Sequence, residues 1–260
     1  MITSKQALQI ILENSENFCT EEIPFLKTVG RILKEDVIAD RDFPPFNRVS
    51  MDGIAVQYAV FERGVREFKI EDIQAAGAEQ LTMNNTDSCF EVMTGAVLPK
   101  NTDSVIPYEQ VTIENKIAKV ITDQVRLRQN VHHKGKDRKC GEVLVKKNTR
   151  ISPAEIGVFA TVGKNTVKVA KLPKTIIIST GDELVEVSEN PLSHQIRKSN
   201  VYTLVSLLKT LNIDAETAHI KDEKELLNKK ISDYLTQFDV LIFSGAVSKG
   251  KFDYLPEVLD

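Results

Sequence analysis

The sequence feature that most constrains the fold is the run Thr-Ile-Ile-Ile-Ser-Thr at Thr175–Thr180. A strand this continuously apolar and β-branched is typical of a parallel sheet whose two faces are both covered by helices. Helical periodicity follows at 199–211 and 223–238, and strand-like segments follow at 214–220 and 239–244. This alternation of strands and helices predicts a parallel α/β sheet with right-handed crossovers.

The middle of the chain has a different texture. From about Tyr58 to Thr149 it consists mostly of short β-rich runs separated by Asn, Asp, Gly and Lys, which predicts a compact β-rich domain. Before it, Pro44 and Pro45 fix their own φ angles and exclude helix from the residue preceding each of them. We expect an ordered loop or a crossing between domains there.

Two further helices carry start signals. Near the N-terminus, Ser4 is the predicted N-cap of a helix whose apolar residues cluster on roughly one face. Later, Ser152 is the predicted N-cap, Pro153 the first helical residue and Glu155 the partner in a capping box. Gly163 is placed to end this second helix.

Acidic turns follow the three predicted strands, at 180–183, 221–223 and 245–253. The carboxyl ends of parallel strands meet at one edge of the sheet, where such sheets bind ligands. Each turn taken alone is explained as an ordinary helix start, because acidic residues favour helix N-termini. Three of them at one edge favour a phosphate-bearing ligand held by free N–H groups, with Mg²⁺ bridging carboxylate and phosphate.

The third turn also resembles a P-loop. Gly245–Lys251 matches the spacing G-x-x-x-x-G-K, but Phe252 stands where the motif needs a Ser or Thr hydroxyl for Mg²⁺. From these residues, a phosphohydrolase of the P-loop type ranks second among the possible functions.

Other polar positions lie in the middle of the chain. Asp52 and Thr94 each precede a glycine and, taken alone, indicate only tight turns. His132 and His133 are adjacent, so they cannot both face one site from a strand, and we expect no zinc site there. The basic run at 134–139 is typical of a solvated face, although it also suits an anion such as phosphate or molybdate.

Composition and patterning exclude several classes of protein. The 34 basic and 37 acidic side chains give a formal net charge of −3, which argues against bulk nucleic-acid binding. No apolar run approaches the roughly 18–20 residues that cross a membrane, and the N-terminus lacks the apolar core of a signal peptide. Cys19, Cys89 and Cys140 form neither a disulfide framework nor a zinc spacing. We expect a cytoplasmic protein that binds neither nucleic acid nor membrane.

Taken in order, these segments resemble the molybdopterin molybdotransferase family, which includes the catalytic C-terminal domain of gephyrin. The resemblance rests on SKQALQIILEN, FPPFNRVSMDGIAV, VMTGAVLPKNTDSVIPYE, the stretch 130–163, ISTGDELVE and FSGAVSKGKFDYLPEVL. None of these motifs is decisive by itself, but the ordered set is specific. The chain departs from the family pattern at Asn47, at Ala246 and at the pair His132–His133.

The resemblance implies an α/β multidomain fold. Residues 1–26 and 173–260 are expected to form a parallel α/β molybdopterin-binding domain that lacks its C-terminal part. Residues 27–46 and 138–172 are expected to form a linking domain, and 47–137 an inserted β-rich domain. The resemblance also implies an elongated homodimer, in which the inserted domain of one subunit reaches the α/β domain of the other.

The resemblance further implies an enzyme of molybdenum cofactor biosynthesis. Its reaction inserts molybdenum from molybdate into adenylylated molybdopterin, releases AMP and depends on Mg²⁺, and the molybdopterin adenylyltransferase is a candidate partner. The family continues past residue 260 with further basic residues and a small β domain, so we expect this stretch to fold and leave open its activity alone. A non-catalytic molybdopterin-binding or scaffold module is the alternative from another class.

The resemblance also implies the site residues. Asp52, Thr94 and Asp137 are expected to line the molybdate pocket and to act in catalysis together with Glu183. Glu183 and Asp253 are expected to hold Mg²⁺ or the pterin ring. The residues expected to bind the pterin and its phosphate are Gly181, Asp182, Asp222, Ser244, Gly245, Ser248, Gly250 and Asp253.

Overall fold

The strand predicted at Thr175–Thr180 is the centre of a parallel sheet in the computed structural model, which describes residues 2–15, 18–245 and 254–259. Strand β13 (Thr175–Thr180) is buried at every position. It pairs in parallel with β16 (Ala215–Ile220) on one edge and with β17 (Val240–Ser244) on the other. The most apolar strand therefore occupies the middle of the sheet, where neighbours cover both its edges.

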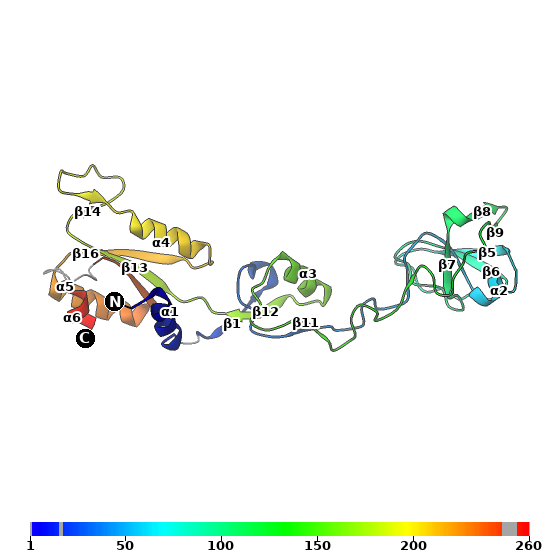
Figure 1. Ribbon diagram of the computed structural model, residues 1–260, viewed down its shortest axis with the longest axis horizontal. Coiled ribbons are helices and arrows are strands. Elements are labelled where there is room, and N and C mark those ends of the chain that lie inside the picture. The colour runs from blue at the N-terminus through cyan, green and yellow to red at the C-terminus, as the bar shows by residue number, and fades with distance from the viewer. Residues whose placement is uncertain (1, 16–17, 246–253, 260) are drawn as a thin grey trace. The chain divides into compact units, whose positions relative to one another are not determined.

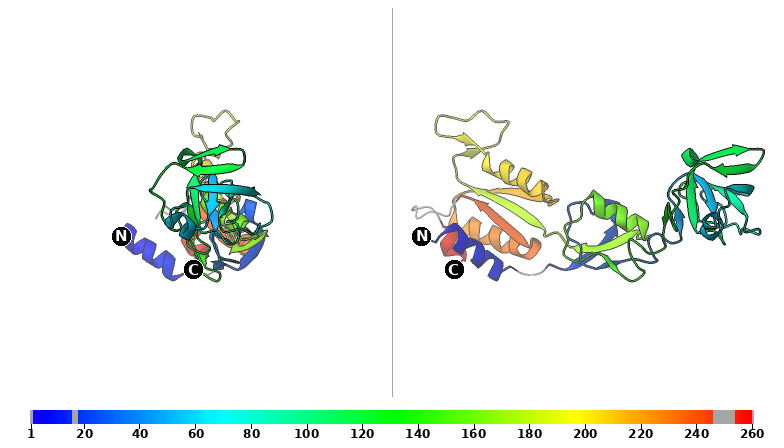
Figure 2. Two further views of the ribbon diagram at one scale, coloured as in Figure 1. Left: turned by 90° about the vertical axis from the view of Figure 1, so that its right-hand side faces the viewer. Right: turned by 45° about the vertical axis from the view of Figure 1, so that its right-hand side comes forward.

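Helices α4 (Asn200–Lys209) and α5 (Lys224–Gln237) lie on opposite faces of this sheet (Figure 1 and Figure 2). Ile176 and Ile178 of β13 belong to one buried core with Leu227 and Ile231 of α5. Since strand side chains alternate between the two faces, Ser179 lies on the opposite face, on the side of α4.

The chain divides into two units, the first made of residues 1–36 and 146–260 and the second of residues 37–145. In the first unit, β1 pairs with β12 in antiparallel fashion, with Thr20 opposite Ala170 and Pro24 opposite Thr166. The further elements of this unit are α1 (Ser4–Glu13), β1 (Thr20–Pro24), a 3-10 helix (Phe25–Lys27), α3 (Pro153–Thr161), β12 (Thr166–Ala170), β14 (Leu184–Val185), β15 (Ile196–Arg197) and α6 (Leu255–Leu259). Among the helices in the described part of the chain, none is both long and apolar enough to cross a bilayer.

The start of α3 agrees with its predicted capping box. Ser152 accepts a hydrogen bond from the Ala154 amide, and the Glu155 carboxylate accepts one from the Ser152 amide. For α1 the predicted N-cap, Ser4, is wrong by one residue. Thr3 is the N-cap instead, because the Gln6 side chain accepts a hydrogen bond from the Thr3 amide and closes a capping box there.

The second unit contains a six-stranded sheet in the order β7-β4-β6-β5-β9-β8. Strand β4, which lies between β7 and β6, is buried at all four positions, with Ile54 in one hydrophobic core and Ala55 in another. The bounds are β2 (Val37–Ile38), β3 (Arg48–Val49), β4 (Gly53–Val56), α2 (Tyr58–Glu62), β5 (Glu67–Gln74), β6 (Ser88–Val92), β7 (Ser104–Pro107), a 3-10 helix (Tyr108–Gln110), β8 (Val111–Glu114), β9 (Ile117–Val120), β10 (Val131–His132) and β11 (Val143–Val145). The β-rich texture of the middle of the chain thus produces a curled sheet.

The predicted Pro-Pro loop is ordered by backbone hydrogen bonds to the segment that follows β10. The Phe43–Pro44 peptide bond is cis. The Asp137 amide donates to the Phe43 carbonyl over 2.9 Å, and the Gly135 amide donates to the Pro44 carbonyl over 2.9 Å. These bonds fix the backbone that carries Asp137.

Candidate functional site

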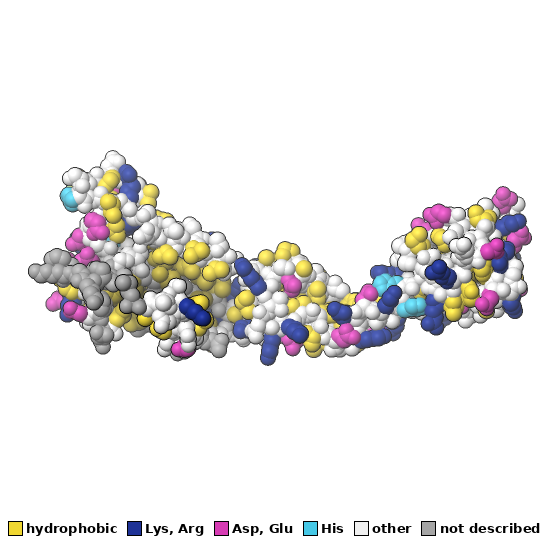
Figure 3. Space-filling view, viewed as in Figure 1, with side chains coloured by type: hydrophobic (Ala, Val, Ile, Leu, Met, Phe, Trp, Pro, Cys, Tyr) yellow, Lys and Arg dark blue, Asp and Glu magenta, His cyan; other side chains and the backbone are white. Residues whose placement is uncertain are grey.

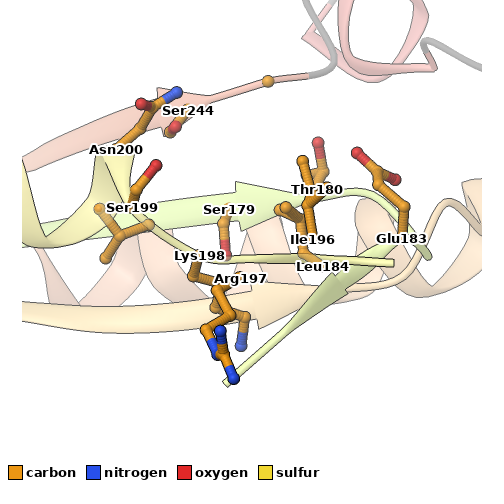
Figure 4. Close-up of a pocket in the computed structure, with 12 residues that line it drawn as sticks. Ser179, Thr180, Glu183, Leu184, Ile196, Arg197, Lys198, Ser199, Asn200 and Ser244 are labelled. Atoms are coloured by element: carbon orange, nitrogen blue, oxygen red, sulfur yellow. The ribbon is translucent and has the colours of Figure 1, made fainter. Parts of the chain in front are cut away.

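A cavity of about 210 Å³ lies at the carboxyl end of β13, in the first unit (Figure 4). This is the edge of the sheet where the sequence predicts a ligand site. The residues that line it are Ser179, Thr180, Glu183, Leu184, Ile196, Arg197, Lys198, Ser199, Asn200, Val201, Ser244 and Gly245.

The turn after β13 places a hydroxyl and a carboxylate beside this cavity. Gly181 has a φ of +126°, a conformation that glycine adopts much more readily than other residues. The Ile196 amide donates to the Glu183 carbonyl over 2.9 Å, which ties the turn to β15. The Thr180 side chain is buried, and its hydroxyl has no hydrogen-bond partner in the described part of the chain. Thr180 and Glu183 both carry their oxygens toward the same side in Figure 4.

The opposite wall of the cavity contains two basic residues, Arg197 and Lys198. Lys198 is only 10% exposed, and its Nζ lies 2.5 Å from Oε1 of Glu186; this ammonium holds the pKa of the Glu186 carboxyl below its usual value. Ser199 is the N-cap of α4 but makes no side-chain cap hydrogen bond, so N–H groups of the first helical turn keep their donor capacity. A helix N-terminus beside a lysine suits an anionic group.

The third wall is formed by the end of β17. Ser244 lies opposite Ser179 in the strand register, and Gly245 follows with a φ of +123°. A Cβ atom at Gly245 would lie 3.1 Å from the Thr180 hydroxyl oxygen, a tight contact, and the positive φ also favours glycine at this position. Ser248, Gly250, Asp253 and the rest of the P-loop-like spacing lie outside the described residues.

The structure brings some of the predicted residues of this unit together. Glu183, Ser244 and Gly245 line the cavity, and Gly181 lies in the turn that carries Glu183. Asp182 is exposed in the same turn, and Asp222 is half-buried between β16 and α5. Within the described ranges, neither of these two aspartates belongs to the cavity lining.

Behind the cavity, the Ser179 hydroxyl lies 3.1 Å from Nδ1 of His219 on β16. Burial, together with the positive charge of Lys198, lowers the pKa of His219 below its usual value, although a hydrogen bond to the Ser179 backbone and the carboxylates of Glu186 and Asp182 act in the opposite direction. His219 is therefore neutral near physiological pH and accepts a proton less readily in the folded chain than in the unfolded chain.

This shift predicts how stability depends on pH. The contribution of His219 is fully present above the usual histidine pKa and is lost as the pH falls toward the lowered pKa of the folded state. When the pH is lowered from about 7.5 to about 5.5, the unfolding free energy of His219→Asn should therefore fall less than that of the wild type, because Asn keeps a polar amide beside Ser179 but does not titrate. Urea unfolding at both pH values measures this. His194→Asn, at an exposed position, is the control and should keep the wild-type slope.

In the second unit, Asp52 and Thr94 form a hydrogen-bonded pair. Oδ1 of Asp52 accepts hydrogen bonds from the Thr94 amide at 2.6 Å and from the Thr94 hydroxyl at 2.7 Å. These two bonds, that of the amide above all, lower the pKa of the Asp52 carboxyl. Next to this pair, the Tyr108 amide donates to the Asp52 carbonyl, and the Tyr108 hydroxyl donates to Glu91 over 2.9 Å. Burial and Glu91 raise the pKa of Tyr108.

The Asp52–Thr94 pair gives a second prediction. Thr94→Val removes the hydroxyl but keeps the backbone amide, so the pKa of Asp52 should rise toward its usual value without reaching it. The ionised Asp52 carboxylate stabilises the fold at pH values above its usual pKa, and this contribution is lost as the pH falls through the lowered pKa of the folded state. Because Thr94→Val brings these two pKa values closer together, the contribution is lost over a narrower pH range in the variant. A ¹³C NMR titration of the Asp52 carboxyl measures the change. Thr112→Val, at an exposed position in β8, should leave the titration unaltered.

Asp137 lies in a basic stretch of the same unit. Its Oδ1 is 2.9 Å from Nε2 of His132, whose Nδ1 is 3.3 Å from Nη2 of Arg48. Histidine and basic side chains gather on one stretch of the surface in the space-filling view (Figure 3). Asp137 is therefore held by a histidine rather than exposed alone in a turn.

The sequence reasoning missed several of these residues. Ser199 and Asn200 were assigned only to the start of a helix and Lys198 was not singled out, although a basic residue before an N-cap serine at the beginning of a crossover helix is a signal for anion binding. Arg48 and Tyr108 were also missed. They become relevant only through strand pairing, which a single sequence does not reveal.

Comparison with known protein families matches most of the chain to two models. Residues 2–163 match the MoeA N-terminal region (domain I and II), and residues 176–260 match the probable molybdopterin binding domain. The second match contains the described part of the cavity, because every residue of its lining lies within 176–260.

Individual relatives agree with these models. A molybdopterin molybdenumtransferase from Synechocystis sp. is 40% identical over 260 residues, covering 99% of this chain and 67% of the relative. One from Staphylococcus aureus is 33% identical over 265 residues, covering 99% of this chain and 62% of the relative. The chain thus spans about two thirds of the length of these curated relatives.

A solved structure shares the fold as well. The molybdopterin biosynthesis MoeA protein from Pyrococcus horikoshii OT3 superposes with a TM-score of 0.84 at 27% identity, covering 94% of this chain and 66% of that protein. The expected fold class, an α/β multidomain protein with a parallel α/β part and a β-rich part, is confirmed. With a family model over more than half of its residues and a relative 40% identical along its length, the chain belongs to the MoeA family, the family of the molybdopterin molybdenumtransferases.

Proposed function

We propose that the protein inserts molybdenum from molybdate into adenylylated molybdopterin and releases AMP, in a reaction that depends on Mg²⁺. The observation that carries this proposal is the cavity at the end of β13, in which the Glu183 carboxylate stands opposite the Lys198 wall and the N-terminus of α4. Such a cavity suits a ligand whose phosphate lies at the N-terminus of α4 and whose bound cation lies at the Glu183 carboxylate.

Within this cavity, the chain's own residues bind and orient the substrate. The N–H groups at the start of α4 face the phosphate, Lys198 lines the same cavity in an ion pair with Glu186, and the Thr180 hydroxyl, which has no partner among the described residues, offers a further hydrogen bond. We assign Gly181, Asp182, Asp222, Ser244, Gly245, Ser248, Gly250 and Asp253 to the binding of the pterin and its phosphate. Of these residues, Ser248, Gly250 and Asp253 lie outside the described ranges.

The residues present fit a magnesium ion. Mg²⁺ prefers oxygen ligands and is commonly bound through one or two protein carboxylates together with substrate phosphates, and Glu183 supplies such a carboxylate beside the Thr180 hydroxyl. We assign Glu183 and Asp253 to this role. In the described part of the chain, no three His, Cys, Asp or Glu side chains group closely enough to hold a metal ion. When bound, Mg²⁺ offsets charge on the pyrophosphate and makes AMP a better leaving group.

We assign the molybdate to the β-rich unit. Asp52 and Thr94 are tied to each other, so each holds the other in one orientation, and Asp137 is oriented by His132. A homodimer remains part of the proposal, as does the molybdopterin adenylyltransferase as a partner, and the cytoplasm remains the proposed compartment.

One assay tests the proposed function. The protein is incubated with adenylylated molybdopterin, Mg²⁺ and molybdate, and the released AMP and the molybdenum-loaded cofactor are measured. The proposal requires both products, and both should vanish when Mg²⁺ is chelated. Binding of the pterin without release of AMP would instead identify a non-catalytic binding or scaffold module. Hydrolysis of a nucleoside triphosphate without pterin would identify a P-loop phosphohydrolase.

A further inference from the structure

Arg48, His132 and Asp137 form a hydrogen-bonded chain in the β-rich unit. Arg48 of β3 and His132 of β10 lie opposite each other in an antiparallel strand pair. Nη2 of Arg48 lies 3.3 Å from Nδ1 of His132, and Nε2 of the same ring lies 2.9 Å from Oδ1 of Asp137. The imidazole ring therefore connects a guanidinium to a carboxylate.

The chemistry of these partners fixes the proton on the ring. A guanidinium group only donates hydrogen bonds, so Nδ1 must accept and carries no proton. The proton of the ring is then on Nε2, from which it is donated to the carboxylate. An imidazolium would direct an N–H at the guanidinium and would lose the contact with Arg48.

We infer that His132 is a positioning residue which, as the neutral ring protonated on Nε2, holds Oδ1 of Asp137 and leaves Oδ2 for the substrate. The His132 side chain is 26% exposed and that of Asp137 is 54% exposed, so the ring is mostly buried and the carboxylate is more accessible to solvent. In the described part of the chain, no hydrogen bond to Oδ2 is present. This role in a reaction rests on the proposed function.

The neighbouring basic side chains do not hold the Asp137 carboxylate in place of the His132 ring. Arg138 directs Nη1 to the backbone carbonyl of Asp137 over 3.0 Å, and Lys134 lies 4.0 Å from Asp42. The backbone of Asp137 is already fixed by its amide hydrogen bond to Phe43. His132 therefore sets the orientation of the Asp137 carboxylate. As a neutral ring, it places no full positive charge beside that carboxylate.

Two substitutions at His132 separate its contact with Asp137 from its contact with Arg48. In His132→Gln, the amide nitrogen reaches the place of Nε2 and keeps a donor for Asp137. In His132→Asn, the shorter amide reaches only the place of Nδ1 and leaves Asp137 without its donor. Release of AMP should stay within about threefold of the wild type in His132→Gln and should fall about tenfold in His132→Asn, the loss expected for one hydrogen bond. His133→Asn, at the adjacent histidine, is the matched control and should keep the wild-type rate.

A spectroscopic readout decides the inference independently of activity. Long-range ¹H–¹⁵N spectra of the imidazoles report which ring nitrogen carries the proton, and His132→Gln identifies the signal of His132. We expect a neutral ring protonated on Nε2, and a shift toward a mixture of tautomers in Arg48→Met. A ring protonated on Nδ1 or on both nitrogens near neutral pH, or a wild-type rate in His132→Asn, overturns the inference. If the wild type releases no AMP, the proposed function fails and the imidazole spectra alone decide the role of His132.

Discussion

Glu183→Gln is expected to lower the release of AMP about a hundredfold or more while the chain stays folded. The substitution keeps the shape of the side chain but removes the charge that faces the cavity, and groups that stabilise charge in a reaction typically contribute factors of this size. Glu183 is exposed and makes no hydrogen bond to another side chain in the described part of the chain, so its loss leaves the core untouched. The rate of AMP release at saturating substrate and Mg²⁺ measures the effect.

The matched control for this variant is Glu189→Gln in the same loop. Glu189 accepts a hydrogen bond from the Glu186 amide, and a Gln side chain keeps that acceptor. The control should retain the wild-type rate, and both variants should unfold within about 0.5 kcal/mol of the wild type, as surface substitutions usually do. Wild-type release of AMP by Glu183→Gln would remove Glu183 from the assignment.

Gly53→Ala is expected to destabilise the β-rich unit by about 3 kcal/mol or more, the upper range of overpacking in a filled core. Gly53 begins β4 and pairs with Val92 of β6 and Pro107 of β7. A Cβ atom there would lie 2.0 Å from the backbone carbonyl oxygen of Ile106. Because the obstacle is backbone inside a sheet, it cannot rotate away as a flexible side chain does. Urea unfolding followed by far-ultraviolet circular dichroism measures the loss.

Gly157→Ala separates this collision from the general effect of replacing glycine. Gly157 lies inside α3, where an added Cβ atom has no neighbour within 4 Å in the described part of the chain. Alanine is favoured over glycine in a helix by about 1 kcal/mol, so this variant should be as stable as the wild type or more stable. If Gly53→Ala unfolds at the wild-type urea concentration, β7 does not approach β4 as closely in solution as described.

The parallel sheet was predictable because its signals are local. A continuously β-branched strand is readable from Thr175–Thr180, and the apolar spacing of α4 and α5 is readable within single segments. The inserted sheet was predictable only as β-rich. Its order places β5 beside β6 in parallel and β4 between β6 and β7, and such pairings depend on contacts between distant residues. The short helix α2 was not predicted, because its five residues lie inside a β-rich context.

The candidate site, too, was predictable where its signals are local and was not predictable where it depends on strand pairing. The turn with Gly181 and Glu183 was predictable, since acidic and glycine-rich turns after parallel strands carry their own signal. The wall with Lys198 was not predictable, because Lys198 and the start of α4 become part of the cavity only when β14 and β15 pair and bring Lys198 back toward Glu186. Likewise, the partner of Asp137 could not be read from the sequence, since the bond between Arg48 and His132 spans 84 positions.

The pairing of β1 with β12 sets the order in which the chain can fold. Pro24 meets Thr166 only after residues 37–145 have been synthesised between them, and closing so long a loop costs conformational entropy. Once folded, the intervening unit holds Val37 opposite Val145 through β2 and β11, which shortens the loop that remains to be closed. During synthesis, this unit is complete before β13 exists, so we expect it to fold first and to nucleate assembly of the discontinuous unit. Mutations that slow folding of residues 37–145 should therefore also delay the parallel sheet, although they lie far from it in the sequence.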